Sequence, residues 1–401
     1  MGFCLCNDME KIRSKKRVFV AMSGGVDSSV TAALLKERGF DVRGIHIKMW
    51  SDPDIPCNFK EDRYDAMRVA AKLNIPFETW DFTKEYKIAV VEYMIREYAA
   101  CRTPNPDVMC NKHVKFGIFL KKALWCGADY VATGHYVRAV PLPRPLSLTK
   151  ETPPSVRGPK GGARPRDVQL LRGVDNNKDQ SYFLWTITQE QLKHCLFPIG
   201  DYTKPEVREF ARKFGLPTAE KDESQGICFI GEINIREFLK KYIPVKPGKV
   251  LTTSGKVVGD HEGLNFFTIG QREGLGIGGG IPYYVAGKNF KTNTLMVAEG
   301  PYDEKLFSDE LVATNINWIS GRPPKLPFSC LARIRYRQPL QKCTVVPKAE
   351  SPAGSEARQG RRKLKAAPLN VTFNEAQRAV TPGQSVVFYQ GEEMLGGGII
   401  T

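Results

Sequence analysis

The sequence predicts an α/β fold: a doubly wound parallel sheet, followed by a small central domain and a C-terminal β-barrel. Three observations support this prediction. Up to about residue 135, short apolar runs alternate with helical segments, which is the pattern of a parallel sheet. Residues 201–245 have a helical pattern, and after Pro247-Gly248 short β-like runs are separated by glycines. With 401 residues, the chain is long enough for two or three domains.

The expected elements follow one another closely along the chain. The first strand is the apolar run 18–22, and the helix after it covers 28–38 because Gly39 stops it. Thr203 is the expected N-cap of a later helix that reaches Phe214. The other expected strands of the sheet are 42–49, 77–82 and 130–132, and its other helices are 61–73, 83–99 and 111–126. The expected strands of the C-terminal part are 283–285, 294–297, 371–373 and 385–389.

Two segments differ from the rest in composition. Residues 141–166 hold seven prolines and few large apolar side chains, so they cannot bury enough surface to offset the entropy of ordering. Residues 347–366 are similar in kind and carry the basic run 361–363. We predict that both are disordered insertions, more often solvated than bound to RNA.

Charge and cysteine content indicate the partners and the compartment. The 59 Lys and Arg residues outnumber the 43 Asp and Glu residues, and the net charge of +16 makes nucleic acid the leading partner class. Solvated lysines are the alternative explanation. The ten cysteines include no Cys-x-x-Cys pair, so we expect a reducing compartment and no structural metal. No run approaches the roughly 18 apolar residues that span a bilayer, so no membrane partner is expected.

The clearest motif is Ser23-Gly24-Gly25-Val26-Asp27-Ser28-Ser29, between a buried strand and a helix. Glycines let the backbone approach an anion, and the first amides of a helix donate to phosphate oxygens. The serines add hydroxyl donors, and Asp27 offers a carboxylate to Mg²⁺. The segment has neither the Gly-Lys-Ser/Thr of a Walker loop nor a Gly-x-Gly-x-x-Gly, which disfavours γ-phosphoryl transfer and dinucleotide binding. It predicts a phosphate-binding loop, with a simple tight turn as the alternative.

Two cysteine segments carry the other candidate groups. In residues 103–111, two prolines stiffen a loop that ends where a helix begins, so Asp107 and Cys110 are presented together. A helix N-terminus favours the thiolate of Cys110, and Asp107 is a candidate acid or base. Cys228 lies in an apolar segment between two glycines, which permits a mobile loop. Taken singly, either cysteine would more often be a packed core residue.

The motif at 23–29 resembles that of the pyrophosphate-loop ATPases, whose fold is adenine nucleotide alpha-hydrolase-like and which adenylate a substrate oxygen. Together with other segments, it makes nearly the whole chain similar to the tRNA-uridine 2-sulfurtransferases, or tRNA 2-thiouridylases, the bacterial MnmA and mitochondrial TrmU family. The other matching segments are 103–116, 132–136, 178–182, the Cys228 segment, 268–272, 333–336 and 382–384.

The resemblance implies ATP-dependent 2-thiolation of a wobble uridine, in which the C2 oxygen is adenylated and then replaced by persulfide sulfur. It implies that Cys228 carries the persulfide, that Cys110 is the partner thiol and that Asp107 is the acid or base. The implied ATP-binding residues are Ala21, Met22, Ser23, Gly24, Gly25, Val26, Asp27, Ser28, Ile47 and Gly134, where Ile47 departs from the methionine common in the family. The implied contacts to the target base and the tRNA are Asn105, Pro106, Asp107, His135, Lys178, Asp179, Gln180, Arg335, Tyr336 and Gln384.

The implied cofactors are ATP and Mg²⁺, and the implied partners are tRNAs for Lys, Glu and Gln and an upstream persulfide sulfur donor. The expected domains are an extension at 1–16, an ATP-binding domain at 17–200, a central tRNA-binding domain at 201–281 with the Cys228 loop, and a barrel domain at 282–401. The two insertions favour a mitochondrial location, with the bacterial cytoplasm as the alternative. The competing functions are another pyrophosphate-loop ligase acting on tRNA, such as a lysidine synthetase, and a non-catalytic tRNA-binding module.

Overall fold

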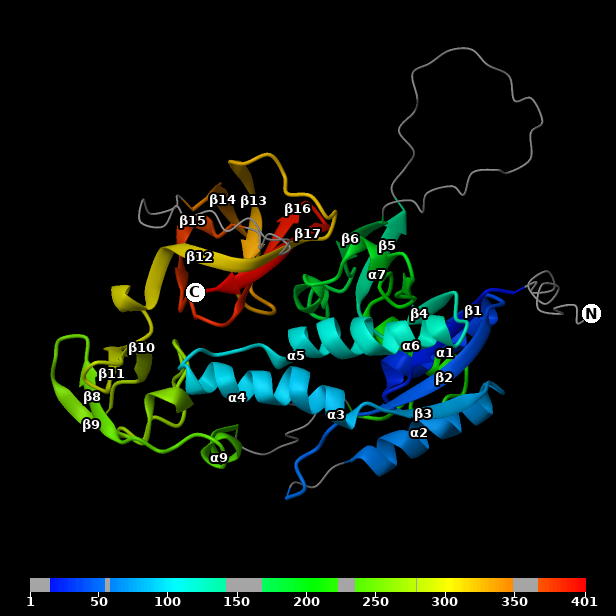
Figure 1. Ribbon diagram of the computed structural model, residues 1–401, viewed down its shortest axis with the longest axis horizontal. Coiled ribbons are helices and arrows are strands. Elements are labelled where there is room, and N and C mark those ends of the chain that lie inside the picture. Colours follow the sequence, from blue (N-terminus) through cyan, green and yellow to red (C-terminus); the bar gives the residue numbers. More distant parts are fainter. Residues whose placement is uncertain (1–14, 55–57, 142–167, 223–234, 279, 349–366) are drawn as a thin grey trace, which may run out of the picture.

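The computed structural model describes residues 15–54, 58–141, 168–222, 235–278, 280–348 and 367–401 (Figure 1). Its N-terminal part is a five-stranded sheet in the order β3-β2-β1-β4-β7, in which every neighbouring pair is parallel. The strands are β1 Arg17–Ala21, β2 Asp41–Lys48, β3 Phe77–Asp81, β4 Tyr130–Ala132 and β7 Cys195–Leu196. The expected strands at 18–22, 42–49, 77–82 and 130–132 are confirmed within one residue at each end.

Apolar side chains cover both faces of this sheet. Val18 and Val20 of β1 lie in one buried cluster, whereas Phe19 lies in another with Trp80. Alternate residues of a strand point to opposite faces, so both faces are packed, as a doubly wound sheet requires. Helices α1, α2 and α6 contact its strands, and α8 packs on α1. The helices of this part are α1 Val26–Glu37, α2 Phe59–Lys72, α3 Thr83–Tyr86, α4 Glu92–Ala99, α5 Pro106–Met109, α6 Leu120–Trp125, α7 Gln189–Leu192 and α8 Lys204–Lys213.

Two pairs of these helices are each joined into one longer helix by a π-helical segment. Residues 87–91 join α3 to α4, and residues 110–119 join α5 to α6. The two resulting helices run side by side from the parallel sheet toward β10 and β11 (Figure 1). The second one begins at Pro106 and not at the expected residue 111, because Pro106 occupies its first turn and Asn105 caps it.

The central part contains α9 Ile235–Lys240 and a four-stranded sheet in the order β10-β11-β8-β9. The strands are β8 Gly248–Thr252, β9 Val257–His261, β10 Tyr283–Asn289 and β11 Thr294–Glu299. The expected domain boundary between residues 281 and 282 cuts through this sheet, because β11 pairs in parallel with β8. We therefore place the boundary after Glu299.

The C-terminal part is a closed six-stranded barrel in the order β12-β15-β14-β13-β16-β17, closed by pairing of β12 with β17. Its strands are β12 Phe307–Trp318, β13 Phe328–Arg333, β14 Gln341–Pro347, β15 Leu369–Arg378, β16 Ser385–Gln390 and β17 Glu393–Ile400. A hairpin of β5 Val137–Pro141 and β6 Val168–Arg172 joins this sheet through a pair between Leu171 and Glu393. The barrel and the N-terminal part therefore share hydrogen-bonded strands.

Both proline-rich or basic insertions connect paired strands. Pro141 pairs with Val168 at the end of the β5–β6 hairpin, and Pro347 pairs with Leu369 at the end of β14 and β15. The insertions themselves, nearly all of the N-terminal extension and the Cys228 segment lie outside the described residues. None of the helices in the described ranges has the length and apolar character needed to cross a bilayer.

Candidate active site

The segment 23–29 forms a tight loop between β1 and α1. Gly24 has φ +85°, and a Cβ there would lie 2.2 Å from the carbonyl oxygen of Asp62 in α2. Only glycine fits this position, because the backbone is left-handed and a second backbone lies against it. The expected turn is confirmed, and α2 forms one of its walls.

Hydrogen bonds of serine hydroxyl groups within the loop stabilise its conformation. The hydroxyl of Ser28 lies 3.1 Å from both the amide and the hydroxyl of Ser23, and the hydroxyl of Ser29 donates to the Gly25 carbonyl at 2.8 Å. Ser23 is exposed whereas Ser28 and Ser29 are buried. The loop thus presents Ser23 to solvent at the N-terminal end of α1, a position that suits a polyphosphate.

The other expected ATP-binding residues surround this loop. A Cβ on Gly134 would lie 2.8 Å from the amide nitrogen of Ser28, so the end of β4 touches the first turn of α1. Ile47, near the end of β2, packs at the edge of the core. β2, β1 and β4 are adjacent in the sheet, so these residues share its carboxyl edge, where ligands bind in open α/β sheets.

Asp27 is held by two donors from outside the loop. Its Oδ1 accepts from the Lys204 ammonium at 2.7 Å and from the Tyr136 hydroxyl at 2.8 Å. Lys204 is the first residue of α8, and Tyr136 lies just before β5. The carboxylate therefore already has a cationic partner.

The second expected segment precedes and begins the long helix. Asn105 accepts from the amide of Val108 at 3.2 Å, which fixes the first turn that carries Asp107. Burial raises the pKa of Asp107, and the Lys115 ammonium opposes that shift. A carboxyl group with a raised pKa is suited to exchange a proton near neutral pH.

The long helix that carries Asp107 packs beside the end of β4. The ring of Phe116 lies 5.8 Å from the ring of His135, which follows Gly134 in the chain. The helix that begins at Pro106 is therefore close to the residue after Gly134.

The two cysteines differ in what the structure describes. Cys110 is 5% exposed and belongs to the apolar core cluster beneath the long helix. It lies at the start of the π-helical segment, one turn after Asp107, and π-helical turns often occur at functional sites. Cys228 lies outside the described residues, so the meeting of the two thiols stays a prediction.

Two expected tRNA contacts are enclosed by protein. His135 is buried between Phe116 and Phe197, its Nδ1 is 2.7 Å from the Thr133 hydroxyl, and burial holds its pKa well below the usual value. Its ring is therefore neutral and structural in this conformation.

Asp179 is buried as well, and its carboxylate binds Arg172 at 3.1 Å and Arg333 at 3.3 Å. It also accepts from the amides of Gly173 and Ser181. The carboxylate of Asp179 thus links the N-terminal part to the barrel, and a contact of Asp179 with tRNA stays a prediction.

The neighbours of Asp179 differ in exposure. Lys178 is partly exposed, and Gln180 accepts from the amide of Tyr136 at 3.1 Å. Tyr336 packs on Phe183 with ring centres 4.6 Å apart, and the exposed Arg337 guanidinium lies 5.2 Å from its ring. Lys178, Gln180 and Tyr336 are therefore partly exposed, and Arg337 is exposed.

Arg335 and Gln384 have protein partners instead. The Arg335 guanidinium donates to the carbonyls of Ile269 and Ala379, both at 3.0 Å. The Gln384 amide donates to the carbonyls of Thr103 and Pro104 at 2.9 and 3.0 Å. In this structure both side chains join the barrel to other parts of the chain.

Thr103 is the point where the three parts of the chain meet. Its amide donates to the Pro382 carbonyl at 2.9 Å, and its hydroxyl lies 3.0 Å from that of Thr268. Gly383 has φ +94°, and a Cβ there would lie 2.8 Å from the Thr103 carbonyl oxygen. The loop that leads to Asp107 is thus held by hydrogen bonds to the barrel turn 381–384 and to the central part.

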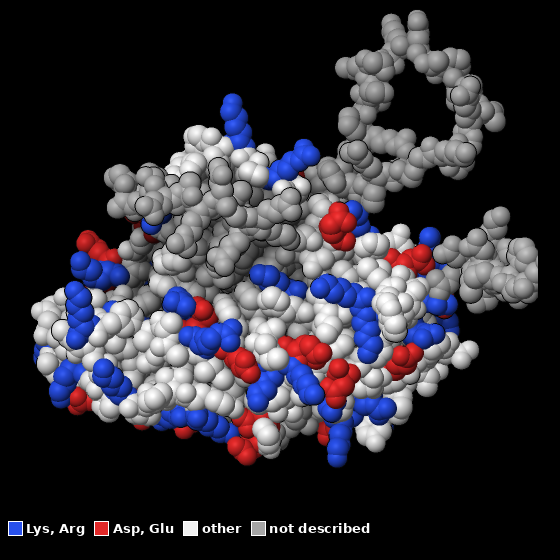
Figure 2. Space-filling model, in the orientation of Figure 1, with Lys and Arg blue, Asp and Glu red and all other residues white. Residues whose placement is uncertain are grey.

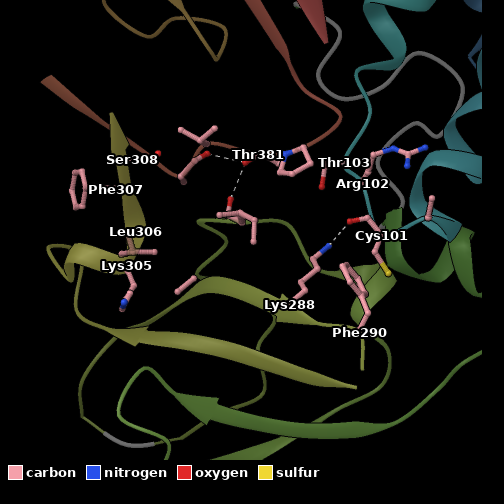
Figure 3. Close-up of a pocket in the computed structure, with 16 residues that line it drawn as sticks. Cys101, Arg102, Thr103, Lys288, Phe290, Lys305, Leu306, Phe307, Ser308 and Thr381 are labelled. Atoms are coloured by element: carbon pink, nitrogen blue, oxygen red, sulfur yellow. Dashed lines mark hydrogen bonds between the residues drawn. The ribbon is translucent and has the colours of Figure 1, made fainter. Parts of the chain in front are cut away.

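A cavity of ≈ 470 Å³ opens beside this junction (Figure 3). Figure 3 shows Lys288 from β10 reaching Cys101, whose carbonyl it binds at 3.1 Å. Burial lowers the pKa of Lys288 to about 8. Because Cys101 follows α4, the ammonium lies at the C-terminal end of that helix, where a cation is favoured.

The contacts of Lys204 and Tyr136 beside the nucleotide loop, and those of Thr103 with the barrel, were not predictable from the sequence. The Thr203-Lys204-Pro205 segment indicated a helix start, which is confirmed by a capping box between Thr203 and Glu206. No local pattern indicates that Lys204 binds a residue 177 positions away.

Three families match consecutive parts of the chain. They are described as tRNA methyl transferase HUP domain (16–232), tRNA methyl transferase PRC-barrel domain (236–299) and aminomethyltransferase beta-barrel domain (308–400). The tRNA-specific 2-thiouridylase MnmA of Bacillus cytotoxicus is 46% identical, covering 98% of this chain and 96% of that protein. The protein of the same name from Streptococcus thermophilus is 47% identical, covering 96% and 95%. A solved structure of the U34-tRNA thiolase NcsA from Methanococcus maripaludis is 16% identical, with a TM-score of 0.32 over 59% of this chain and 70% of that one.

Proposed function

Because this chain belongs to the tRNA-specific 2-thiouridylase family, we propose that it replaces the C2 oxygen of a wobble uridine in tRNA by sulfur. It is a sulfurtransferase that uses ATP to thiolate tRNA. The observation that carries the proposal is the loop at 23–29 on the carboxyl edge of the parallel sheet, with Gly134 at the end of β4 lying against Ser28. A lysidine synthetase is not favoured, because the full-length relatives are 2-thiouridylases.

ATP would lie with its phosphates on the loop and its adenine near Ile47. The donors for the phosphates are the backbone amides and the hydroxyl of Ser23, with Gly24 and Gly134 giving close backbone approach. Mg²⁺ would arrive on the phosphates and screen the departing pyrophosphate. Asp27 Oδ1 already accepts two hydrogen bonds, so any contact of Asp27 with the ion would use its other oxygen.

The chemistry requires two displacements. The C2 oxygen of uridine attacks the α-phosphorus, the bond to the β-phosphate oxygen breaks, and pyrophosphate leaves. In one order, the terminal sulfur of a Cys228 persulfide attacks C2, AMP leaves with the former C2 oxygen, and Cys110 then attacks Sγ of Cys228, which frees the thiolated base. In the other order, Cys110 attacks Sγ of Cys228 first and releases sulfide, which attacks C2 and displaces AMP. In both orders the attack of Cys110 breaks the sulfur–sulfur bond of the persulfide and forms a Cys110–Cys228 disulfide, and a thiol reductant restores both residues. Asp107 would accept or return the proton of the base, as its raised pKa permits.

The tRNAs are those for Lys, Glu and Gln, and the sulfur comes from an upstream persulfide donor. The surplus of basic residues favours binding of tRNA. Figure 2 shows Lys and Arg interspersed with Asp and Glu on the face in view, so no single basic patch marks the tRNA site there. The named relatives are bacterial, which favours the bacterial cytoplasm; the mitochondrial location has no support from them.

Mass analysis of tRNA nucleosides tests this function after incubation with ATP, Mg²⁺, a persulfide sulfur donor and a thiol reductant. We expect 2-thiouridine with the wild type and none with Cys110→Ser or Cys228→Ser, while all three proteins bind ATP. Cys195→Ser is the matched control. The exposed fraction of Cys195 is 4%, similar to the 5% of Cys110, but Cys195 lies on β7 and not on the long helix. Thiolation by both active-site variants would refute the two-thiol mechanism, and absence of tRNA-dependent pyrophosphate release by the wild type would refute the function.

A further inference from the structure

An ion pair beside the nucleotide loop has no part in the chemistry described above. Lys204 and Asp27 meet at 2.7 Å, and the side chain of Lys204 is only 10% exposed. Placing an ammonium in such an enclosed position is unfavourable unless a partner compensates it. Asp27 is that partner, and it lies in the first turn of α1, where phosphates would bind.

Several contacts fix Lys204 in this place. Its amide donates to Asp175 at 3.0 Å, and the capping box of α8 and Pro205 define the helix start. α8 packs against α1, with Val207 and Ala211 in the same apolar cluster as Val30. The ammonium is therefore held at the loop by the packing of two helices.

The charges around the loop explain what this arrangement does. ATP brings several negative charges to the N-terminal end of α1, and a bare carboxylate in that turn would repel them. Both donors to Asp27 Oδ1 lie outside the loop, so they draw the carboxylate toward Tyr136 and α8. The loop amides and the Ser23 hydroxyl are left to face the phosphates.

We propose that Lys204 is a positioning residue for ATP: its ammonium neutralises the Asp27 carboxylate and holds it aside, so that the loop can accept the triphosphate. This inference rests on the proposed function, because it assumes that ATP binds at residues 23–28. It assigns Lys204 an effect on ATP binding that passes through Asp27 and not through a direct contact with phosphate.

A charge cycle tests the inference. ATP binding is measured by titration calorimetry, and tRNA-dependent pyrophosphate release is measured in parallel, for the wild type, Lys204→Met, Asp27→Asn and the double variant. We expect Lys204→Met to weaken ATP binding about tenfold to a hundredfold, because it exposes an unpaired charge. The double variant should bind ATP within about threefold of Asp27→Asn, because the carboxylate that needs neutralising is gone.

Two outcomes would overturn the inference. One is ATP binding by Lys204→Met that equals that of the wild type. The other is ATP binding by the double variant that is as weak as that of Lys204→Met, which would indicate a direct phosphate contact or a purely structural role of Lys204. Lys193→Met is the matched control, because Lys193 is also largely enclosed, at 15%, and pairs with Glu190 on α7. Wild-type protein that neither binds ATP nor releases pyrophosphate would refute the proposed function instead.

Discussion

Gln384 offers a test of whether the barrel shapes the active site or only binds RNA. Its amide nitrogen donates to two consecutive carbonyls, those of Thr103 and Pro104, at 2.9 and 3.0 Å. Asn105 and Asp107 follow directly. Replacing Gln384 by Ala removes both bonds, and replacing it by Glu also turns a carboxylate toward two carbonyl oxygens.

The structure gives the size of the effect. A net contribution of about 0.5–1.5 kcal/mol for each hydrogen bond makes the loss about 1–3 kcal/mol in the alanine variant. If the loop must hold Asp107 in place for catalysis, thiolation slows by roughly 5- to 150-fold. The glutamate variant should be slower still, because its carboxylate cannot donate to either carbonyl.

Single-turnover thiolation and tRNA binding separate the two roles. We expect the rate at saturating tRNA to fall in both variants while the Kd for tRNA stays within about twofold. Gln377→Ala is the control, because the Gln377 amide donates to Glu375 within the barrel. A raised Kd with an unchanged saturated rate would show that Gln384 contacts tRNA and that the positioning argument is wrong.

Three other variants test separate parts of the site. Gly24→Ala should abolish ATP binding in calorimetry, because its Cβ would lie 2.2 Å from the Asp62 carbonyl oxygen; binding within twofold of wild type would contradict the loop geometry. Asp107→Asn should lose thiolation yet unfold at a higher temperature at pH 7.5. The raised pKa means that the folded state binds this proton more tightly than the unfolded state does, so the wild type loses stability as the pH rises and Asp107 ionises. The stability gained by the asparagine variant should therefore vanish below the ordinary carboxyl pKa. A gain in stability that does not depend on pH would refute this explanation. Asp179→Ala should lower stability by about 3–5 kcal/mol in denaturant unfolding, because Arg333 loses its buried partner, and a loss below 1 kcal/mol would contradict that assignment.

The features that could be predicted from the sequence are those whose residues are contiguous in the chain. The loop at 23–29 was predictable because its glycines, its hydroxyls and the flanking strand and helix are contiguous in the chain. The start of the long helix was misplaced because Pro104 and Pro106 both indicated a loop, although proline is favoured in a first helical turn.

The partners of charged and amide side chains were not predictable. Asp179 meets Arg333 across 154 positions, and Gln384 meets Thr103 across 281. Such pairs depend on how the barrel docks on the ATPase part, and the sequence around each residue is equally consistent with a contact to RNA. The resemblance supplied the family, but it did not distinguish these internal contacts from external ones.

The placement of the two long insertions has a practical consequence for engineering. Each one departs from and returns to a hairpin whose last pair, Pro141 with Val168 or Pro347 with Leu369, keeps its ends together. Doubling the length of such a connection costs only about 0.6 kcal/mol of closure entropy, so its length is nearly neutral for the fold. Fluorophores or affinity tags grafted at these two hairpin ends would both be carried by the eight-stranded sheet that contains the barrel, one on β5–β6 and one on β14–β15.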